Sequence, residues 1–555
     1  MSLERESLRW NGWGPPAQAA VFNEARAAWL LEQFAQRFGR PLTPSPAPVS
    51  LDKVVLPPSR LAATALSRLR AACGEEAVRD DHFSRVTHAL GRSLPDLLRL
   101  RRGEIALAPD AVVTPRDEDS VAAVLRICAE CDVAVVPIGG ATSVVGGVEA
   151  RRAAGQDAAI ALDTTRMAAV LDVDPEGGLA SFQAGIDGPA LEGALRKRGL
   201  TLGHFPQSFE YSTLGGWIAT RSSGQQSNGY GGIDRLLVAL RLVTPQGEIR
   251  TIEVPRSAAG PDVNQMVLGS EGTLGVIVQA TLRVSPAPNH RDDRAMLFPS
   301  FAAGVEAVRE IARSGGGLDL LRLSDAGETE LALLQRFDPA RRVDPVALLM
   351  AALARVGYAA GRSFLLYGGE GRAARPVRRA VEQARALGRS RRGLPLGRAP
   401  GRNWRRERFR APYLRDWLLD QGVAVDTFET ALPWSRLQAG HQAVRRAIDD
   451  AARRHAGGGI GMAHLSHSYL DGACLYFTLF YPLEVGHELP QWTAIKSDVT
   501  DAIVRAGGTL SHHHGVGVDH AAWLAGEKGK LGMALLRSLK RAVDPSGVMN
   551  PGKLL

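Results

Sequence analysis

The first hundred residues place apolar side chains at the spacing of surface helices. The segment EARAAWLLEQFAQRFG, residues 24–39, has apolar residues three or four positions apart, with charged residues between them. This spacing brings the apolar side chains to one face of an α-helix. We therefore expect residues 1–108 to form a helical N-terminal region.

The pattern changes at Pro109, where short apolar runs alternate with amphipathic segments. The helical pattern SVAAVLRICAECD precedes two strand-like runs, VAVVPIGG and AAIALDTT. We expect residues 109–288 to form a strand-rich α+β domain with glycine-rich turns. A helix in FAAGVEAVREIARSG and a strand in LDLLRLSD indicate a second α+β domain over 289–505. Residues 506–555 then form a C-terminal segment with a histidine-rich loop.

One apolar segment, VALLMAALARVGYAAG at 346–361, stands out by its length. We expect it to pack as a core helix, although it could also line an apolar tunnel or touch a membrane. It is shorter than the ~18 apolar residues that a membrane-spanning helix needs, and the N-terminus has no signal-peptide pattern. We expect a cytoplasmic protein that could bind peripherally to a membrane.

Charge and cysteine content narrow the possibilities further. The net charge of +9 comes from 67 basic and 58 acidic residues, with the excess almost all arginine. Such a chain can attract nucleic acid, anionic lipid or a phosphorylated substrate, but solvated surface arginines are the simpler explanation. We expect no nucleic-acid partner, and the cluster Arg402–Arg410 to be mostly surface or a contact with anionic lipid. Four cysteines indicate a reducing compartment, and the lone pair Cys128 and Cys131 predicts no zinc site.

Three glycine-rich segments carry the first functional signal. They are PIGGATSVVGG at 137–147, the Ser/Thr/Gly-rich run at 207–231, and LGSEGTLGVI at 268–277. Glycines let backbone amides approach an anion, and successive amides with hydroxyls form a nest for phosphate oxygens. A structural turn explains the first segment equally well when it is taken alone. Together the three segments predict one large ligand with a pyrophosphate.

The motifs PIGGATS, STLGGWIATRSSG, GSEGTLG and NPGKLL resemble the FAD-binding flavoenzyme superfamily that includes vanillyl-alcohol oxidase. The resemblance implies an α+β fold, with a two-lobed FAD-binding domain and a cap domain built on an antiparallel sheet. Residues 137–147 contain no His or Cys for a covalent link, so we expect noncovalent FAD. The expected FAD-binding residues are Pro137, Ile138, Gly139, Gly140, Ala141, Thr142, Ser143, Gln207, Ser208, Ser212, Thr213, Thr220, Arg221, Ser222, Ser223, Gly269, Ser270, Glu271, Gly272, Thr273, Leu274 and Gly275.

Six further stretches, in the same order, resemble the alkyldihydroxyacetone-phosphate synthases: RWNGWG, GHFPQSFEYSTLGGW, LRLSD, YLRD, GACLYF and SHHHGVG. This resemblance implies exchange of the acyl group of acyl-dihydroxyacetone phosphate for a fatty alcohol, through an adduct at flavin N5 and without net redox. It also implies a lipid-like phosphorylated substrate, and a homodimer is a further expectation. The alternatives are an FAD-linked dehydrogenase of 2-hydroxy acids such as glycolate or lactate, or a protein that binds FAD or lipid without catalysis.

The resemblance assigns roles to three residues outside the histidine run. Arg415 in YLRD is expected to bind the substrate phosphate, with Asp416 orienting it. Arg322 in LRLSD matches a second functional arginine, and Asp325 is its expected partner, since an unpaired charge there would be costly. Tyr476 in CLYF matches a catalytic tyrosine, and nearby cations are expected to favour its phenolate. A buried structural tyrosine is the simpler alternative.

The histidine run Ser511–Gly517 allows several interpretations. Neighbouring residues on a strand face opposite sides, so three adjacent histidines would not converge on one metal ion. His512 and His514 could do so with His464 or His467, but we expect no metal site. By resemblance His513 is the expected base, with His512 and His514 in support. A polar turn with one useful histidine is the plain alternative.

Overall fold

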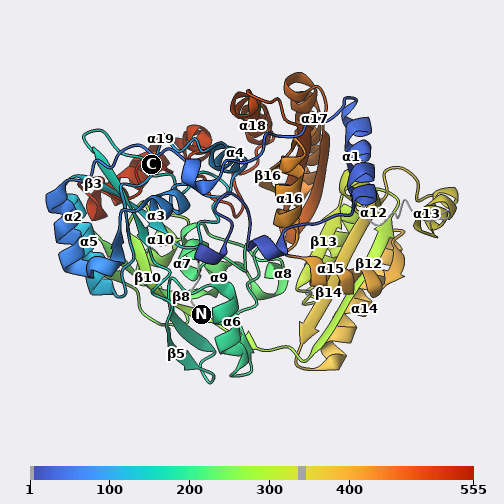
Figure 1. Cartoon of the computed structure of the whole chain (residues 1–555). Helices are drawn as coiled ribbons and strands as arrows, with labels where there is room; N and C mark the ends of the chain where they lie inside the picture. Colours follow the sequence, from blue (N-terminus) through green and yellow to red (C-terminus); the bar gives the residue numbers. More distant parts are fainter. Residues whose placement is uncertain (1–4, 335–344) are drawn as a thin grey trace.

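The computed structural model describes residues 5–334 and 345–555, and the α+β prediction is confirmed (Figure 1). Two sheets near the N-terminal helices form one unit, and a larger antiparallel sheet forms the other. Within the described residues the first sheet runs β1 Val78–Arg79, β2 Ala111–Val113, β4 Ala158–Asp163, β3 Val133–Ile138, and the second runs β5 Val170–Asp174, β6 Leu179–Gln183, β10 Val276–Arg283, β8 Leu237–Thr244, β9 Gly247–Arg250. A two-stranded ribbon joins β7 Leu200–Thr201 to β11 Ser285–Pro286.

The apolar runs after Pro109 form the parallel part of the first sheet. Strands β2, β4 and β3 pair in parallel, and β4 is buried along its whole length. A strand covered on both faces needs apolar side chains at every position, which explains the continuous runs. The helices of this unit are α2 Ala63–Cys73, α3 His82–Thr87, α5 Glu118–Glu130, α6 Gly188–Arg196, α7 Leu214–Ala219, α8 Ser227–Tyr230, α9 Ile233–Leu236 and α10 Val263–Val267. Helix α1 Glu24–Phe38 packs instead against the second unit, and α4 Leu94–Arg102 contributes to the core of that unit.

The second unit is a seven-stranded antiparallel sheet with its main core under four helices on one face. Its strand order is β15 Leu394–Gly397, β12 His290–Phe298, β14 Ser363–Gly371, β13 Leu320–Ser324, β17 Ile460–Ser468, β18 Gly472–Pro482, β16 Val423–Pro433. Helices α11 Phe301–Arg313, α14 Ala374–Ser390, α17 Trp434–Ala456 and α18 Glu488–Arg505 share one hydrophobic core with this sheet. The remaining helices are α12 Ala326–Leu334, α13 Pro345–Arg355, α15 Ala399–Glu407, α16 Ala411–Asp420 and α19 Ala521–Val543.

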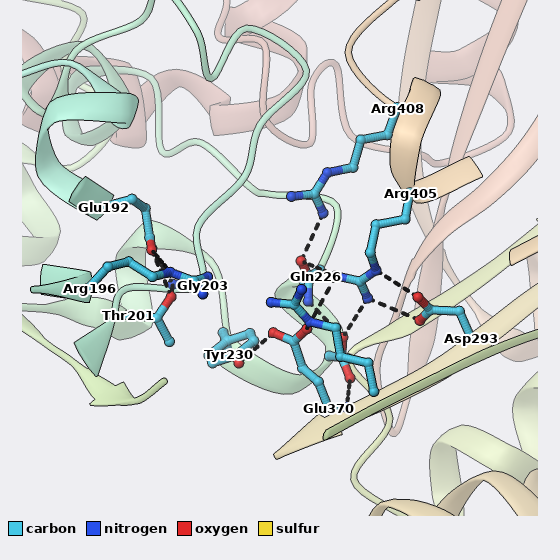
Figure 2. A network of polar contacts seen from close by, with 12 residues as sticks. Glu192, Arg196, Thr201, Gly203, Gln226, Tyr230, Asp293, Glu370, Arg405 and Arg408 are labelled. Carbon is cyan, nitrogen blue, oxygen red and sulfur yellow. Dashed lines mark hydrogen bonds and ion pairs between the residues drawn. The ribbon is translucent and has the colours of Figure 1, made fainter. Parts of the chain in front are cut away.

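A buried polar network joins the two units, and it corrects the expectation for the arginine cluster (Figure 2). Arg405 forms a bidentate pair with Asp293, at 2.6 and 3.0 Å, and its NH1 also lies 3.2 Å from Glu370. Gln226 of the first unit accepts hydrogen bonds from Arg405 and from Arg408. These two arginines therefore contact buried polar groups inside the protein and are not surface charges. Spacing alone cannot separate them from exposed neighbours, because their partners Asp293, Glu370 and Gln226 lie in other parts of the chain.

Helix α13 also corrects an expectation. The segment at 346–361 was expected in the core, but Leu348 is 60% exposed and Leu349 is 52% exposed. Leu353 is buried, so the helix contacts the rest of the protein on only one side. Figure 1 shows it at the outer edge of the second unit. Across residues 5–334 and 345–555, the helices are all too short or too polar to span a membrane.

Candidate active site

A cavity of about 520 Å³ lies between the glycine-rich loops of the first unit and one face of the seven-stranded sheet. Side chains alternate between the two faces of a strand, and this alternation builds the wall. The residues of this sheet that line the cavity are Leu320, Arg322, Val425, Asp426, Thr427, Met462, His464, Ser466, His467, Tyr476, Thr478 and Phe480. All but Asp426 and His467 follow the alternation. Their neighbours Leu321, Leu465 and Phe477 belong to the core under the helices. One face of the sheet is thus core and the other is cavity wall.

Most of the residues predicted from sequence line this cavity. They are Pro137, Ile138, Gly139, Gly140, Ala141, Thr142, Ser143, Gln207, Ser208, Ser212, Thr213, Thr220, Ser222, Ser223, Glu271, Gly272, Gly275, Arg322, Arg415, Tyr476, His513 and His514. Arg221, Gly269, Ser270, Thr273, Leu274 and His512 lie outside the lining. Arg221 points elsewhere and donates a 2.6 Å hydrogen bond to Gln265. The structure therefore brings together the loops and the sheet residues that the motifs singled out.

The first glycine-rich loop packs closely against the loop at 211–213. A Cβ on Gly140 would lie 1.8 Å from the carbonyl oxygen of Tyr211, and one on Gly139 would lie 2.0 Å from Thr213 Oγ1. Real side chains do not approach backbone atoms this closely, so only glycine fits at these positions. Ala141 has a φ of 53°, in the left-handed region. The glycines therefore hold two cavity loops in contact, a role that adds to the anion approach expected from sequence.

The residues present fit FAD. Loop backbone and hydroxyl groups from three segments face one cavity, the arrangement that suits a dinucleotide. Thr213 Oγ1 is buried there and has no hydrogen-bond partner in the described part of the chain, so it is free to serve a ligand. Glu271, from the third segment, is 7% exposed, and burial raises its pKa to about 7.

Two arginines bring positive charge to the cavity. Arg415 on α16 donates to the carbonyl oxygen of Arg92 at 2.8 Å, while its Nε and NH2 have no hydrogen-bond partner among the described residues. Burial lowers the pKa of both arginines, that of Arg92 to about 10 with Arg5 adding to the effect. Asp416, the expected orienting group, lies 3.7 Å from Arg415 but accepts its 2.5 Å hydrogen bond from the amide of Trp13. The positive charges of Arg92 and Arg415 are thus incompletely neutralised.

Arg322 does not pair with Asp325, contrary to the sequence expectation. Its NH2 contacts Glu328 at 2.5 Å and His464 Nδ1 at 3.1 Å. Burial raises the pKa of Glu328, but Arg322 and His464 outweigh it and lower that pKa to about 2. Asp325 instead lies 3.3 Å from His441. The expected pair of Arg322 and Asp325 does not form, because Arg322 lies on β13, whereas Asp325 is at the turn into α12 and points to the other side.

Tyr476 faces the cavity from β18, but its electrostatics differ from the expectation. Burial raises the pKa of Tyr476, and neighbouring acidic groups add to the rise, whereas Thr427 and Arg415 only partly oppose it. The prediction that cations would favour the phenolate is therefore wrong for the protein without its ligands. Tyr476 holds its proton and can donate a hydrogen bond.

The histidine run forms a turn between α18 and α19, so the strand argument against convergence was wrong. The His513 and His514 rings are 4.7 Å apart, and both lie near Tyr476, at 6.1 and 5.5 Å between ring centroids. Burial is the main reason that the pKa values of His512 and His514 are lowered to about 4. Both rings are neutral near pH 7.

Two buried carboxylates fix the turn from opposite sides. Glu429 on β16 accepts hydrogen bonds from the amides of His512, His513 and His514 at 2.7–2.8 Å. Glu271 accepts from the amides of Val516 and Gly517 at 2.6 and 2.7 Å. One carboxylate comes from each unit, so the turn bridges the cavity.

Sequence reasoning missed Arg92, Glu328 and Glu429. Glu429 had a signal, because it interrupts the apolar strand pattern VAVDTFETALP with a charge that alternation turns toward the cavity. Glu328 lies one helical turn after LRLSD and resembles an ordinary exposed helix residue. Arg92 is one arginine among many in the N-terminal region. Its burial depends on contacts with distant residues.

Comparison with known proteins agrees with this architecture. Residues 109–253 match the FAD binding domain model, and residues 287–554 match that of FAD linked oxidases, C-terminal domain. The chain is 32% identical to the alkyldihydroxyacetonephosphate synthase of Dictyostelium discoideum, covering 99% of this chain and 94% of the relative. The synthase of Trypanosoma brucei brucei is 31% identical, covering 99% and 92%. A solved alkyldihydroxyacetonephosphate synthase structure aligns with a TM-score of 0.83 at 29% identity over 99% of each chain.

The similarity spans both units and the loops between them, and it extends over nearly the whole of each relative. The resemblance drawn from the sequence motifs is confirmed, and FAD is the cofactor that the two matched domains have in common. The chain belongs to the alkyldihydroxyacetonephosphate synthase family of FAD-dependent enzymes.

Proposed function

We propose that the protein exchanges the acyl group of acyl-dihydroxyacetone phosphate for a fatty alcohol, with FAD held noncovalently. The C1–O bond to the acyl group breaks, a C1–O bond to the alcohol oxygen forms, and a fatty acid leaves. No electrons are gained or lost overall. The observation that carries the proposal is one cavity that combines FAD-binding loops, unpaired arginine nitrogens, a buried tyrosine and an apolar wall.

The phosphate of the substrate is assigned to Arg415 and Arg92. A guanidinium pairs with phosphate oxygens through parallel N–H groups. Arg415 has two nitrogens free for this contact, and Arg92 supplies a second buried cation beside it. A dianion between them would remove the cost of holding two partly neutralised charges away from water.

The alkyl chains are assigned to the apolar part of the cavity wall. Its residues come from α12, α16 and the large sheet, and they include Leu331, Leu414, Leu418, Met462 and Phe480. Each buried methylene contributes about 0.8 kcal/mol, so a long chain gains considerable binding free energy from such a wall. We expect this wall to set the length of the alkyl chain that the protein accepts.

Proton transfer at C1 is assigned to Tyr476 and His513, with His512, His514 and Arg322 in support. Bound FAD supplies the nucleophilic N5 atom. Because Tyr476 keeps its proton, it suits hydrogen-bond donation to the leaving carboxylate oxygen, and a neutral histidine suits proton acceptance.

Two further predictions stay untested. They are homodimer formation and contact with a membrane surface, to which exposed Leu348 and Leu349 could contribute.

The test is incubation of the purified FAD-loaded protein with palmitoyl-dihydroxyacetone phosphate and radiolabelled hexadecanol. We expect labelled alkyl-dihydroxyacetone phosphate and an equal amount of free palmitate. The unphosphorylated acyl-dihydroxyacetone is the matched control, and its rate is expected to fall at least tenfold because the arginine pair has no partner. Absence of ether product, together with bleaching of FAD by D-lactate or glycolate, would instead identify a 2-hydroxy-acid dehydrogenase.

A further inference from the structure

Glu429 is a buried carboxylate whose two oxygens contact different groups. It lies on β16 and is 2% exposed. Oε1 accepts hydrogen bonds from the Ser511 hydroxyl at 2.6 Å and from the three amides of the histidine turn. Burial would raise the pKa of Glu429, but His513 and His514 outweigh it and hold that pKa well below its usual range. The residue is an anion at the centre of the turn.

The second oxygen begins a chain of ring nitrogens. Oε2 lies 2.7 Å from Nδ1 of His513. That nitrogen is also 3.0 Å from Nδ1 of His512, and Nε2 of His512 is 2.6 Å from the hydroxyl of Tyr469. The order is Glu429, His513, His512, Tyr469. His513 lines the cavity, whereas Glu429, His512 and Tyr469 lie behind it.

A metal ion is the competing explanation for this cluster. Glu429, Cys474, His512 and His513 each offer a ligand atom, all within 4.8 Å of one another. Zinc bonds to nitrogen of 2.0–2.1 Å put tetrahedral ligands about 3.3 Å apart. The separations of 2.7 and 3.0 Å are both shorter than this. The first is an ion-pair contact, and the second is a hydrogen bond. Three amides and a hydroxyl already occupy Oε1. The distances favour a hydrogen-bonded chain.

The distances also decide which ring nitrogens carry protons. The anion of Glu429, 2.7 Å from Nδ1 of His513 in an ion-pair contact, favours a hydrogen on that nitrogen over a lone pair. That hydrogen is donated to Nδ1 of His512 at 3.0 Å, which accepts and is therefore unprotonated. His512 then carries hydrogen on Nε2 and donates it to Tyr469. In the neutral ring of His513 the lone pair is left on Nε2.

We propose that Glu429 is a positioning residue that fixes His513 in its Nδ1–H form, so that Nε2 can accept the proton removed from C1 of the substrate. When Nε2 takes that proton the ring becomes a cation, and the anion of Glu429 stabilises it. His512 and Tyr469 hold the ring orientation from behind. The inference rests on the proposed function for the identity of the reaction but not for the proton positions.

The test compares Glu429→Gln with the wild-type holoenzyme. The amide oxygen of glutamine can replace Oε1 at the turn, which leaves its NH₂ group facing Nδ1 of His513 and forces the opposite tautomer. We expect kcat of alkyl exchange to fall roughly 10²- to 10⁴-fold, with KM and FAD content unchanged within about threefold. The pH dependence of kcat should also change, because the anion of Glu429 no longer faces the His513 ring.

A second readout needs no turnover. In ¹⁵N-histidine-labelled wild-type holoenzyme, the His513 signals, assigned by their loss in His513→Gln, are expected to show Nδ1–H with bare Nε2. Tyr469→Phe removes only the far end of the chain and should reduce kcat less than tenfold. An Nε2–H tautomer, a stoichiometric metal ion in the holoenzyme, or near wild-type kcat and pH profile in Glu429→Gln would each overturn the proposal. If the tautomer is as expected but no ether forms, only the proposed function fails.

Discussion

The two walls of the cavity use different chemistry. The first unit presents mainly glycine-rich loops, hydroxyls and backbone groups, and it adds the ionisable side chains of Arg92 and Glu271. The seven-stranded sheet and α16 present arginines, histidines and a tyrosine between aliphatic residues. Backbone groups make a rigid cradle that cannot titrate, whereas ionisable side chains can bind charge and move protons. The difference assigns cofactor binding to one wall and chemistry to the other.

The largest effect on stability is expected where the walls are joined. Arg405→Met would leave Asp293 and Glu370 buried beside each other without their shared cation. Removing one partner of such a buried pair costs about 3–5 kcal/mol. We expect the free energy of unfolding in urea to fall by that amount.

Arg406→Met is the matched control for this joint. Arg406 is next in the chain, its side chain is 74% exposed, and its ion pair with Glu407 is at the surface. Its loss should change the free energy of unfolding by less than about 0.5 kcal/mol. Equal stability of the Arg405 and Arg406 variants would show that the buried ion pairs of Arg405 do not stabilise the protein.

A smaller effect on stability, but a selective one on cofactor, is expected from Gly140→Ala. The added Cβ would collide with the Tyr211 carbonyl and separate two cradle loops. Overpacking of this kind costs about 1–3 kcal/mol, and the displaced loops should release FAD during purification. Gly193→Ala adds the same methyl group on the exposed side of α6, with no atom within 4 Å, and should retain FAD. Full FAD content in Gly140→Ala would contradict a cradle built from backbone contacts.

Most of the cavity loops of the first unit could be located from sequence, and the residues of the sheet wall only in part. Gly139 and Gly140 are visible in the sequence as a glycine pair directly after an apolar strand, although the groups that require them, Tyr211 and Thr213, belong to a distant loop. The strand at 472–482 and the orientation of Tyr476 follow from local alternation. These last two features depend on short-range geometry, which the order of residues records directly.

Long-range pairing explains what sequence reasoning could not find. The sequence favours nearby Asp325 as the partner of Arg322, but in the fold Arg322 contacts Glu328 and His464. The pKa of Tyr476 depends on burial, which comes from distant parts of the chain. The histidine run was argued as a strand, whereas two carboxylates more than eighty residues away fold it as a turn. Each error concerns a partner that no local pattern identifies.

The central claim is that the sheet wall performs chemistry without holding the cofactor, and Tyr476→Phe in the FAD-loaded protein tests it most directly. The substitution removes one hydroxyl and keeps the ring, so FAD content and the free energy of unfolding should stay near wild type. The account predicts that kcat for labelled alkyl-dihydroxyacetone phosphate falls at least about 10²-fold. Turnover within threefold of wild type at full FAD occupancy would contradict it.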